Sequence, residues 1–337
     1  MAVTIADVAR HAGVSRSTVS YVLSGNRPIS PRTCERVERA IKELSFTPHA
    51  GARSIRTRRT GVIAMALPMV HGPHNQVQMP YVWAAMSAAQ DAGLKLLMLT
   101  ADDDGAAIRD VAATSLVDGV MLMEVQEQDP RVVLLAELGV PAVIVGSPDR
   151  AHGLPCVDFD FTAMAHELAD HLLELGHEAV GYLGQAPEVF ERRAAYALHA
   201  RDAVTAALAK RGQRSAWVTC DGSPQGVRDS LSRLLDELPD LSGLIVYNER
   251  ALRPAMDRLA SLGRSVPEDL SVIALCPDEE AQQTTPALTS LSLPADELAR
   301  LAVNSLAGVI EGQAIPARQL LTPTWTARAS TAAAPAH

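Results

Sequence analysis

Hydrophobic positions at helical spacing predict three short helices at the N-terminal end of the chain. Residues 4–7 have the spacing of a capping box, so the first helix is expected to begin at Ile5. Gly13 would end that helix in a sharp turn before Ser15 caps the second, which gives a helix-turn-helix. Residues 30–31, Ser-Pro, are typical of the start of a third helix. The apolar positions expected on the buried faces are Val8, Ala9 and Ala12, then Val19, Val22 and Leu23, then Val37, Ile41 and Leu44.

From residue 61 onward, short apolar runs typical of buried strands alternate with stretches of helical spacing. The expected strands are 62–67, 94–100, 119–124, 142–145, 179–183, 215–219, 243–246 and 270–275, and the helices include 82–92, 163–175, 197–211, 227–238 and 251–262. This order predicts parallel sheets flanked by helices, with the strands in one sheet or two. Residues 145–160, rich in proline and glycine, are interpreted as a crossover between two lobes. The cleft between such lobes is the expected small-molecule site.

Charge is distributed unevenly along the chain. Residues 1–60 contain eleven arginines and lysines against four acids, a formal charge of +7, whereas the whole chain carries −9. The remaining residues therefore carry −16. A basic N-terminal region on an acidic body is typical of a nucleic-acid-binding protein. The alternative is that these arginines only form a solvated face.

Composition favours a globular protein of the cytoplasm. The 337 residues are 47% apolar, which is enough for a sizeable core and excludes a disordered chain. No apolar run is long enough to cross a bilayer and the N-terminus lacks a signal-peptide core, so no membrane partner is expected. The cysteines lie far apart without metal-type spacing, as expected in a reducing compartment. They are Cys34, Cys156, Cys220 and Cys276.

No cofactor, metal or catalytic site is predicted. His71 and His74 lack a third ligand, and the three aspartates at 102–104 lack the ligand spacing of a calcium loop. The chain contains no glycine-rich phosphate loop, nucleophile elbow or paired-carboxylate arrangement. It is therefore not expected to be an enzyme.

The N-terminal region resembles the lactose/galactose repressor (LacI/GalR) family, and the resemblance extends over essentially the whole chain. Its most specific blocks are TIADVA at 4–9, AGVS at 12–15, TVS at 18–20 and VLSG at 22–25. Further blocks are FTPHAGARSIRT at 46–57, LVDGV at 116–120, LGH at 175–177, YLG at 182–184, VPEDLSV at 266–272, PALTS at 286–290 and RAST at 328–331.

The resemblance implies an N-terminal all-α helix-turn-helix domain followed by an α/β two-lobed core like that of periplasmic binding proteins. The DNA-binding domain would span residues 1–46, a hinge helix or linker 47–60, and the effector-binding and dimerisation core 61–331. Within the core, one lobe would comprise about 61–157 with 291–322, and the other about 158–290. Residues 332–337 are expected to form a disordered tail.

The resemblance also implies how the N-terminal region binds DNA. The second helix would lie in the major groove and read bases through Arg16, Ser17 and Tyr21, with Arg16 suited to guanine. Alternatively, Arg16 and Tyr21 contact only phosphates. Residues assigned to the DNA backbone are Thr4, Ser15, Thr18 and Asn26. The hinge would place Ala52, Arg53, Ile55 and Arg56 at the minor groove, with Ile55 as an apolar wedge or, alternatively, packed on the core.

For the effector, the resemblance places six residues around the cleft. They are Asn75, Asp160, Arg192, Tyr196, Asn248 and Cys276. Arg192 could bind a carboxylate or phosphate there, or could be an ordinary surface arginine. Sugar- and purine-binding members often carry an Asp-Asp pair where this chain has Cys276 and Pro277, which argues against a simple hexose.

The predicted function is a homodimeric transcriptional repressor that binds a pseudo-palindromic double-stranded DNA operator, with its affinity modulated by an unidentified small-molecule effector. Two alternatives are a solute-binding protein and an α/β enzyme with an accessory DNA-binding domain. The sequence leaves open whether the ligand acts as an inducer or a corepressor. The C-terminal tail has no leucine heptad, so nothing in it predicts a tetramer.

Overall fold

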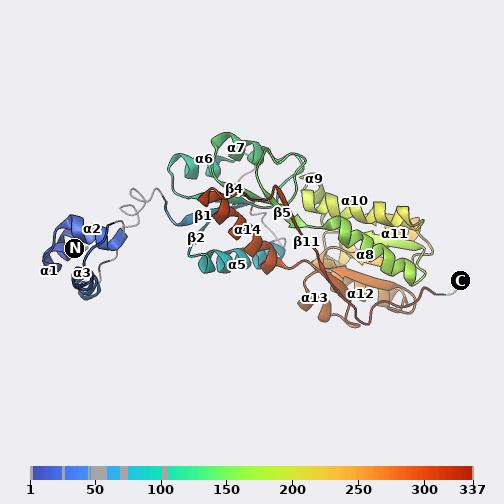
Figure 1. Ribbon diagram of the computed structural model, residues 1–337. Helices are drawn as coiled ribbons and strands as arrows, with labels where there is room; N and C mark the ends of the chain where they lie inside the picture. Colours follow the sequence, from blue (N-terminus) through green and yellow to red (C-terminus); the bar gives the residue numbers. More distant parts are fainter. Residues whose placement is uncertain are drawn as a thin grey trace. The chain divides into compact units, whose positions relative to one another are not determined.

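The computed structural model describes residues 3–24, 27–44, 46, 59–68, 75–100 and 105–335. It forms two compact units, Met1–Thr60 and Gly61–His337, which are described here one after the other (Figure 1). No helix of the described residues is both long and apolar enough to span a membrane.

The first unit is the expected helix-turn-helix followed by a third helix. Its helices are α1 (Ile5–Ala12), α2 (Arg16–Ser24) and α3 (Pro31–Glu43). The capping box is present, because the backbone N–H of Thr4 donates to Asp7 Oδ2 at 3.0 Å. Gly13 ends α1 with a φ of 61°, and Ser15 Oγ accepts the backbone N–H of Thr18 at 3.1 Å. These contacts confirm the helix starts and the turn that the sequence predicts.

A small apolar core holds the three helices together. Val8, Val19 and Val37, one from each helix, are fully buried. Leu23, which the sequence places on the buried face of α2, is 40% exposed, so that prediction is wrong. Its position in the last turn of α2 carries it past the core formed by the other two helices.

The second unit contains two six-stranded sheets. The first has the order β11-β5-β4-β3-β1-β2 with every neighbouring pair parallel. Its strands are β1 (Val62–Leu67), β2 (Lys95–Thr100), β3 (Gly119–Leu122), β4 (Ala142–Val145), β5 (Cys156–Phe159) and β11 (Arg318–Leu321). Its helices are α5 (Asn75–Asp91), α6 (Ala106–Ala113), α7 (Pro130–Leu138) and α14 (Ala295–Glu311). We call this sheet and these helices the first lobe.

The second sheet has the order β12-β10-β9-β8-β6-β7 and is parallel except for β12, which is antiparallel to β10. Its strands are β6 (Ala179–Leu183), β7 (Arg214–Val218), β8 (Gly243–Val246), β9 (Ser271–Leu275), β10 (Thr289–Ser292) and β12 (Thr324–Thr326). Its helices are α8 (Phe161–Glu174), α9 (Pro187–Glu191), α10 (Ala195–Lys210), α11 (Pro224–Glu237), the 3-10 turn η1 (Glu249–Ala251), α12 (Leu252–Ser261) and α13 (Asp278–Gln282). These elements form the second lobe.

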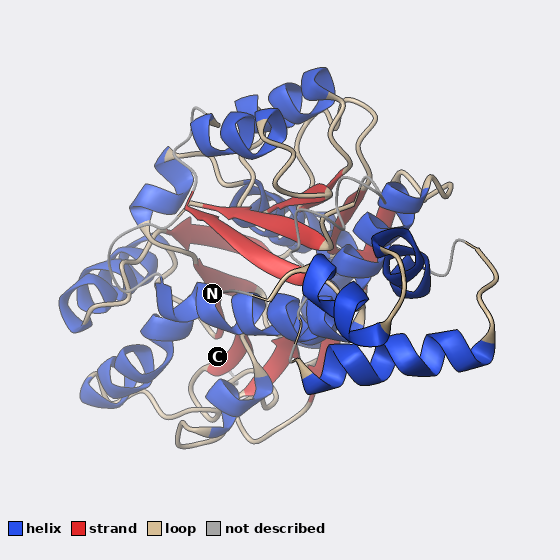
Figure 2. Ribbon diagram, turned by 90° about the vertical axis from the view of Figure 1, so that its left-hand side faces the viewer, coloured by secondary structure: helices blue, strands red, loops and turns tan. Residues whose placement is uncertain are grey.

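Each sheet is covered by helices on both faces, because successive side chains of a strand point to opposite sides. In β1, Ile63 and Met65 join the core that contains α5 and α14, whereas Ala64 and Ala66 join the core that contains α6 and α7. The second sheet is arranged likewise, between α8 with α10 and α11 with α12. Figure 2 shows the strands in the interior and the helices outside them. The predicted parallel sheets flanked by helices are confirmed.

The proline- and glycine-rich segment 145–160 is not the crossover that the sequence predicts. It joins β4 to β5, which are neighbours in the first sheet. The chain leaves the first lobe only after Phe159, where β5 ends and Asp160 caps α8. It returns between β10 and α14, and passes over once more between β11 and β12. The lobes are therefore joined by closely spaced connections at one edge of each sheet.

The end of the chain is docked on the second lobe. Residues 332–337 are expected to be a disordered tail, which is wrong for 332–335. His177 is fully buried beneath this segment, and its Nε2 lies 3.1 Å from the carbonyl oxygen of Ala332. Its Nδ1 lies 3.0 Å from Ser242 Oγ, and the backbone N–H of Ala332 donates to Ser271 Oγ at 3.0 Å. These polar contacts fix residues 332–335 to the second lobe, because the small alanine side chains of this segment offer little apolar contact area.

Acid is expected to weaken the core through His177. Burial lowers its pKa and the charge of His171 lowers it further, although the hydrogen bond to Ala332 opposes both. An unfolded histidine binds a proton below about pH 6.5, whereas folded His177 stays neutral there, so the free energy of unfolding should fall as the pH drops below about 6.5. The loss would approach about 1.4 kcal/mol per pH unit and stop below the lowered folded pKa. Urea unfolding at a series of pH values, compared between wild type and His177→Gln, measures this slope; equal slopes would contradict the assignment.

Candidate functional site

The exposed surface of α2 is the candidate DNA-reading surface. Arg16 and Ser17 at its start are exposed, and Tyr21 one turn later is half-buried. The guanidinium of Arg27 lies 5.9 Å from the centre of the Tyr21 ring. By contrast, Arg36 on α3 donates from Nε to the Ala12 carbonyl at 3.2 Å, so its guanidinium caps the carboxyl end of α1. The three predicted base-reading residues therefore share one side of one helix.

The residues assigned to the DNA backbone already have local roles. The Thr4 hydroxyl donates to Asp7 Oδ2 at 2.6 Å, and Ser15 and Thr18 share a hydrogen bond of 2.9 Å between their hydroxyls. Asn26 and the hinge residues Ala52, Arg53, Ile55 and Arg56 lie outside the described residues. The assignments at these positions remain predictions.

A cavity of about 90 Å³ lies between the two lobes. Its walls come from the carboxyl ends of strands in both sheets, which is where ligands of open α/β sheets bind. Leu67, Glu124, Val145 and Phe159 end or follow strands of the first sheet, and Gln185, Tyr247, Glu249 and Cys276 follow strands of the second. The cavity therefore lies where the sequence predicts the cleft between the lobes.

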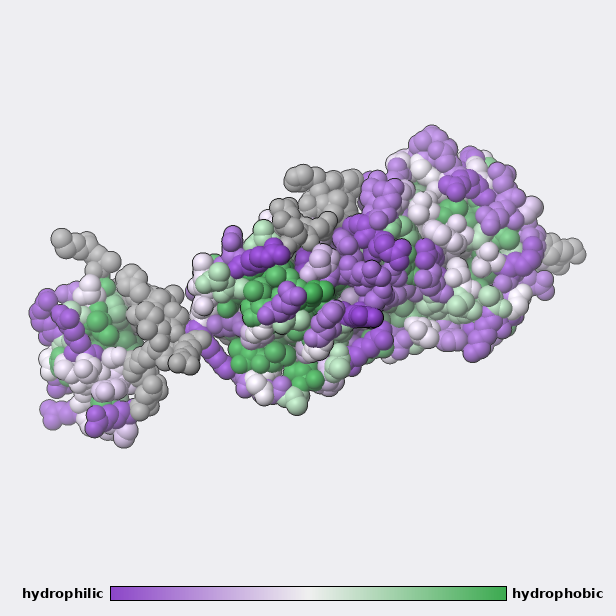
Figure 3. All heavy atoms as spheres, turned by 90° about the horizontal axis from the view of Figure 1, so that it is seen from above, coloured by the Kyte–Doolittle hydropathy of each residue, from purple (hydrophilic) through white to green (hydrophobic). Residues whose placement is uncertain are grey.

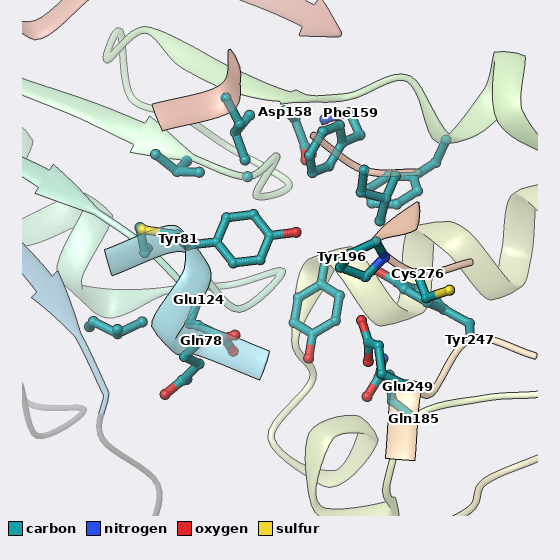
Figure 4. Close-up of a pocket in the computed structure, with 18 residues that line it drawn as sticks. Gln78, Tyr81, Glu124, Asp158, Phe159, Gln185, Tyr196, Tyr247, Glu249 and Cys276 are labelled. Atoms are coloured by element: carbon teal, nitrogen blue, oxygen red, sulfur yellow. The ribbon is translucent and has the colours of Figure 1, made fainter. Parts of the chain in front are cut away.

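Aromatic rings form much of this cavity. The chain has only twelve Phe, Trp and Tyr residues, and five of them line this one space: Tyr81, Phe159, Phe161, Tyr196 and Tyr247. Tyr196 and Tyr247 meet edge to face, with ring centres 6.3 Å apart and planes at 79°. Tyr81 extends from α5 toward Tyr196 across the cavity (Figure 4). Burial raises the pKa of all three tyrosines, so their hydroxyls stay protonated at neutral pH.

Polar side chains complete the walls. Gln78 and Glu124 lie on the first-lobe side, and Gln185 and Glu249 lie on the second-lobe side (Figure 4). Glu124 forms an ion pair with Arg192, which lies at the end of α9 in the second lobe. Asp158 is 4% exposed, and burial raises the pKa of its carboxyl above the usual range.

The six predicted effector residues divide into three groups. Tyr196 and Cys276 line the cavity, and Arg192 stands beside it, paired with Glu124. Asp160 and Asn248 do not line it. Asp160 Oδ1 accepts the backbone N–H of Ala163 at 2.9 Å, and Asn248 Nδ2 donates to the Cys220 carbonyl at 2.6 Å. Asn75 begins α5, and its side chain lies outside the description.

Two further predictions concern the Asp-Asp position and metals. Asp278, next to the Cys276–Pro277 pair, binds Arg328 at 2.7 Å and therefore does not supply a carboxylate to the cavity. His71, His74 and residues 102–104 lie outside the described residues. Among the residues that the structure describes, no group of three or more His, Cys, Asp or Glu is arranged to hold a metal ion.

Backbone contacts join the lobes at the rim of the cavity. The N–H of Ala195 donates to the Val125 carbonyl at 2.9 Å, and the N–H of Glu127 donates to the Arg193 carbonyl at 3.1 Å. An ion pair between Arg193 and Glu127 adds to this bridge. The bridge and the Arg192–Glu124 pair would break if the lobes separated.

One helix of the first lobe presents an apolar strip to solvent. Trp83 is 63% exposed, and Met79 and Met86, four residues before it and three after it on α5, are 36% and 44% exposed. On the face drawn in Figure 3, hydrophobic side chains also gather more densely on the first lobe than on the second. Large exposed apolar surface of this kind is typical of protein–protein contacts.

Comparison with known proteins identifies both the helix-turn-helix unit and the two-lobed unit. Residues 4–49 match the bacterial regulatory proteins of the lacI family, and residues 169–331 match a periplasmic binding protein-like domain. The HTH-type transcriptional regulator CelR of Thermobifida fusca is 30% identical over 325 residues, which cover 90% of this chain and 92% of that protein.

Solved structures of transcriptional regulators have the same fold. A transcriptional regulator CelR–cellobiose complex aligns with a TM-score of 0.68 at 26% identity, covering 97% of this chain and 99% of that one. The lac repressor dimer bound to operator and an anti-inducer aligns with a TM-score of 0.84 at 24% identity, covering 99% and 100%. The second likeness is one of fold.

Proposed function

Because this chain belongs to the lacI family of bacterial regulatory proteins and is therefore a DNA-binding transcriptional regulator, we propose that it is a homodimeric, cytoplasmic repressor of a pseudo-palindromic operator. A small molecule in the cavity between the lobes changes its affinity for that operator. The observation that carries the proposal is the joint presence, in one chain, of a basic helix-turn-helix and a two-lobed core with a cavity at the strand ends.

The DNA-binding part of the proposal rests on α2. Arg16 and Ser17 are exposed at the amino end of the second helix of the helix-turn-helix, which is the end that contacts base edges in this class of fold. Arginine donates two parallel hydrogen bonds to guanine O6 and N7. The charge of +7 on residues 1–60 favours the phosphate backbone, so affinity should fall steeply as salt rises.

Replacing Arg16 by alanine is expected to relax sequence preference. The lost pair of hydrogen bonds would lower affinity for the preferred operator by about 10- to 100-fold, with a smaller loss on random DNA. Titration of both DNAs with wild type and Arg16→Ala measures the two losses. Arg39→Ala, an exposed change on α3, is the matched control and should affect both DNAs equally if at all. An equal loss on both DNAs for Arg16→Ala would assign Arg16 to phosphate contact.

The ligand part of the proposal rests on the cavity and its rim. The CelR–cellobiose complex is a relative in which a small molecule is bound, and the present chain has its cavity at the strand ends of both lobes. A ligand that contacts both walls binds the closed form better than the open form. It can shift the equilibrium only by that difference in affinity.

The dimer part rests on the apolar strip of α5. Two DNA-binding units related by a two-fold axis require a two-fold operator, and an isologous contact between the two first lobes would supply the axis. Trp83, Met79 and Met86 are the residues that such a contact would bury.

Selection of bound sequences from random duplex DNA tests the whole proposal. The purified chain is expected to enrich a palindrome with half-sites one helical turn or a multiple apart. Repeating the selection with small molecules extracted from cells distinguishes induction, in which enrichment is lost, from corepression, in which it appears. If no sequence is enriched under either condition, the alternatives of a solute-binding protein or an enzyme would be favoured instead.

A further inference from the structure

The cavity between the lobes has an unusual balance of charge. Three carboxylates line it, from Glu124, Asp158 and Glu249, whereas no lysine, arginine or histidine is found among the described residues that line it. Arg192, which is not among those lining residues, forms an ion pair with the lining residue Glu124. A space lined by acids and aromatic rings is suited to a cation, because both carboxylates and ring faces attract positive charge.

Two buried oxygen atoms on the wall accept no hydrogen bond from the residues that the structure describes. Asp158 Oδ2 is one, although Oδ1 of the same carboxyl accepts the backbone N–H of Phe159 at 2.9 Å. Gln78 Oε1 is the other, since its Nε2 faces the Pro68 carbonyl at 3.4 Å. Both side chains are 4% exposed and line the cavity. A buried acceptor without a donor is costly, so these atoms indicate a ligand that donates hydrogen bonds.

We propose that the cavity binds a small molecule carrying a protonated amine, which donates to the carboxylates and lies against the tyrosine rings. This ligand is the small-molecule effector of the proposed function, and its effect on DNA binding rests on that function. The amine would be enclosed by Tyr81, Tyr196 and Tyr247, with Asp158 and Glu249 within reach.

The effects of these carboxylates on neighbouring groups agree with this placement. Burial raises the pKa of Tyr81, and the charges of Glu249 and Asp158 raise it further, which places both carboxylates close to one hydroxyl. Burial also raises the pKa of Asp158 more than the hydrogen bonds of Ser147 and Phe159 and the charges of His199 and Arg318 lower it. His199 and Arg318 do not line this cavity. A bound cation would offset the cost of burying the charged carboxyl of Asp158.

The same wall disfavours the other common ligand classes. An anionic ligand such as a sugar phosphate would meet carboxylates, with no cation among the described lining residues to offset them. A neutral sugar offers acceptors as well as donors, and the described lining side chains that can donate are the tyrosine hydroxyls, Gln78, Gln185 and the Cys276 thiol. An ammonium group donates without accepting and so matches the surplus of acceptors.

Matched pairs of small molecules test the charge preference directly. The full-length protein would be titrated, by calorimetry and thermal shift, with D-glucosamine against D-glucose and with putrescine against butane-1,4-diol. We expect a charged member to bind at least about tenfold more tightly than its neutral partner. Equal or tighter binding of the neutral members, or no binding of any charged member at millimolar concentration, would overturn the proposal.

Charge-removing variants locate the effect. Glu249→Gln and Asp158→Asn keep the shape of each side chain, and each should reduce the ratio of charged to neutral binding by about tenfold. Asp257→Asn, on an exposed position of α12, is the control and should leave the ratio unchanged. An unchanged ratio in both cavity variants would overturn the assignment. The selection of DNA sequences without ligand tests the proposed regulator independently of these titrations. A protein that enriches a palindrome but shows no preference for amines would contradict only the amine site.

Discussion

Replacing Asp129 by alanine is expected to destabilise the core by about 3–5 kcal/mol, because it leaves the guanidinium of Arg131 buried without its counter-ion. Both side chains are buried, at 4% and 1% exposure, and Arg131 Nη2 lies 2.6 Å from Asp129 Oδ2. Asp129 also caps α7 by accepting the backbone N–H of Arg131, and it accepts the N–H of Gln126 at 3.0 Å. Urea unfolding of wild type and Asp129→Ala measures the loss of stability.

The pair also holds a wall of the cavity. Arg131 Nη2 donates to the carbonyl of Glu124 at 3.1 Å, and the carboxylate of that glutamate forms the ion pair with Arg192. The double variant Asp129→Leu, Arg131→Met removes both charges and should recover much of the stability, since burying an ion pair is itself expensive. A loss below about 1 kcal/mol for Asp129→Ala would mean that water reaches Arg131 in solution.

Strands with continuous apolar sequences were predictable, whereas the short strands β5, β10, β11 and β12, which carry polar residues, were not. The predicted bounds of β1, β4, β6 and β8 agree with the structure residue for residue. β5 (CVDF), β10 (TSLS) and β11 (RQLL) escape a pattern search because each carries polar side chains. These strands form by pairing with distant segments, as β11 does with β5, and local periodicity contains no information about such pairing.

Two of the six predicted effector residues, Asp160 and Asn248, do not line the cavity, although residues one or two positions away do. Asp160 was expected at the cavity, but Asp158 lies there, because β5 continues to Phe159 and Asp160 is the residue that caps the next helix. Likewise Asn248 turns toward the Cys220 carbonyl while its neighbours Tyr247 and Glu249 line the cavity. The rule that ligands meet the carboxyl ends of strands gives the correct segments. Which side chain faces the ligand depends on where each strand ends.

Replacing Trp83 by glutamate is expected to convert the proposed dimer into monomers and to weaken operator binding by about 10²- to 10⁴-fold. The indole is 63% exposed in the single chain, and the dimer contact proposed for α5 would bury it against a second apolar strip. A charge placed there would have to be desolvated or would keep the two copies apart. Binding of the second DNA unit is effectively intramolecular in a dimer, and that advantage disappears in a monomer.

Sedimentation velocity and operator titration of the same preparation separate the two effects. Trp217→Glu is the matched control, because Trp217 is 40% exposed on β7 of the second lobe, where its ring lies 4.7 Å from the Arg201 guanidinium. A glutamate there can pair with that arginine, so this variant should keep both the dimer mass and the operator affinity. If Trp83→Glu also remains dimeric with unchanged affinity, the dimer axis does not pass near α5. If it becomes monomeric yet keeps full affinity, the two DNA-binding units do not act together on one operator.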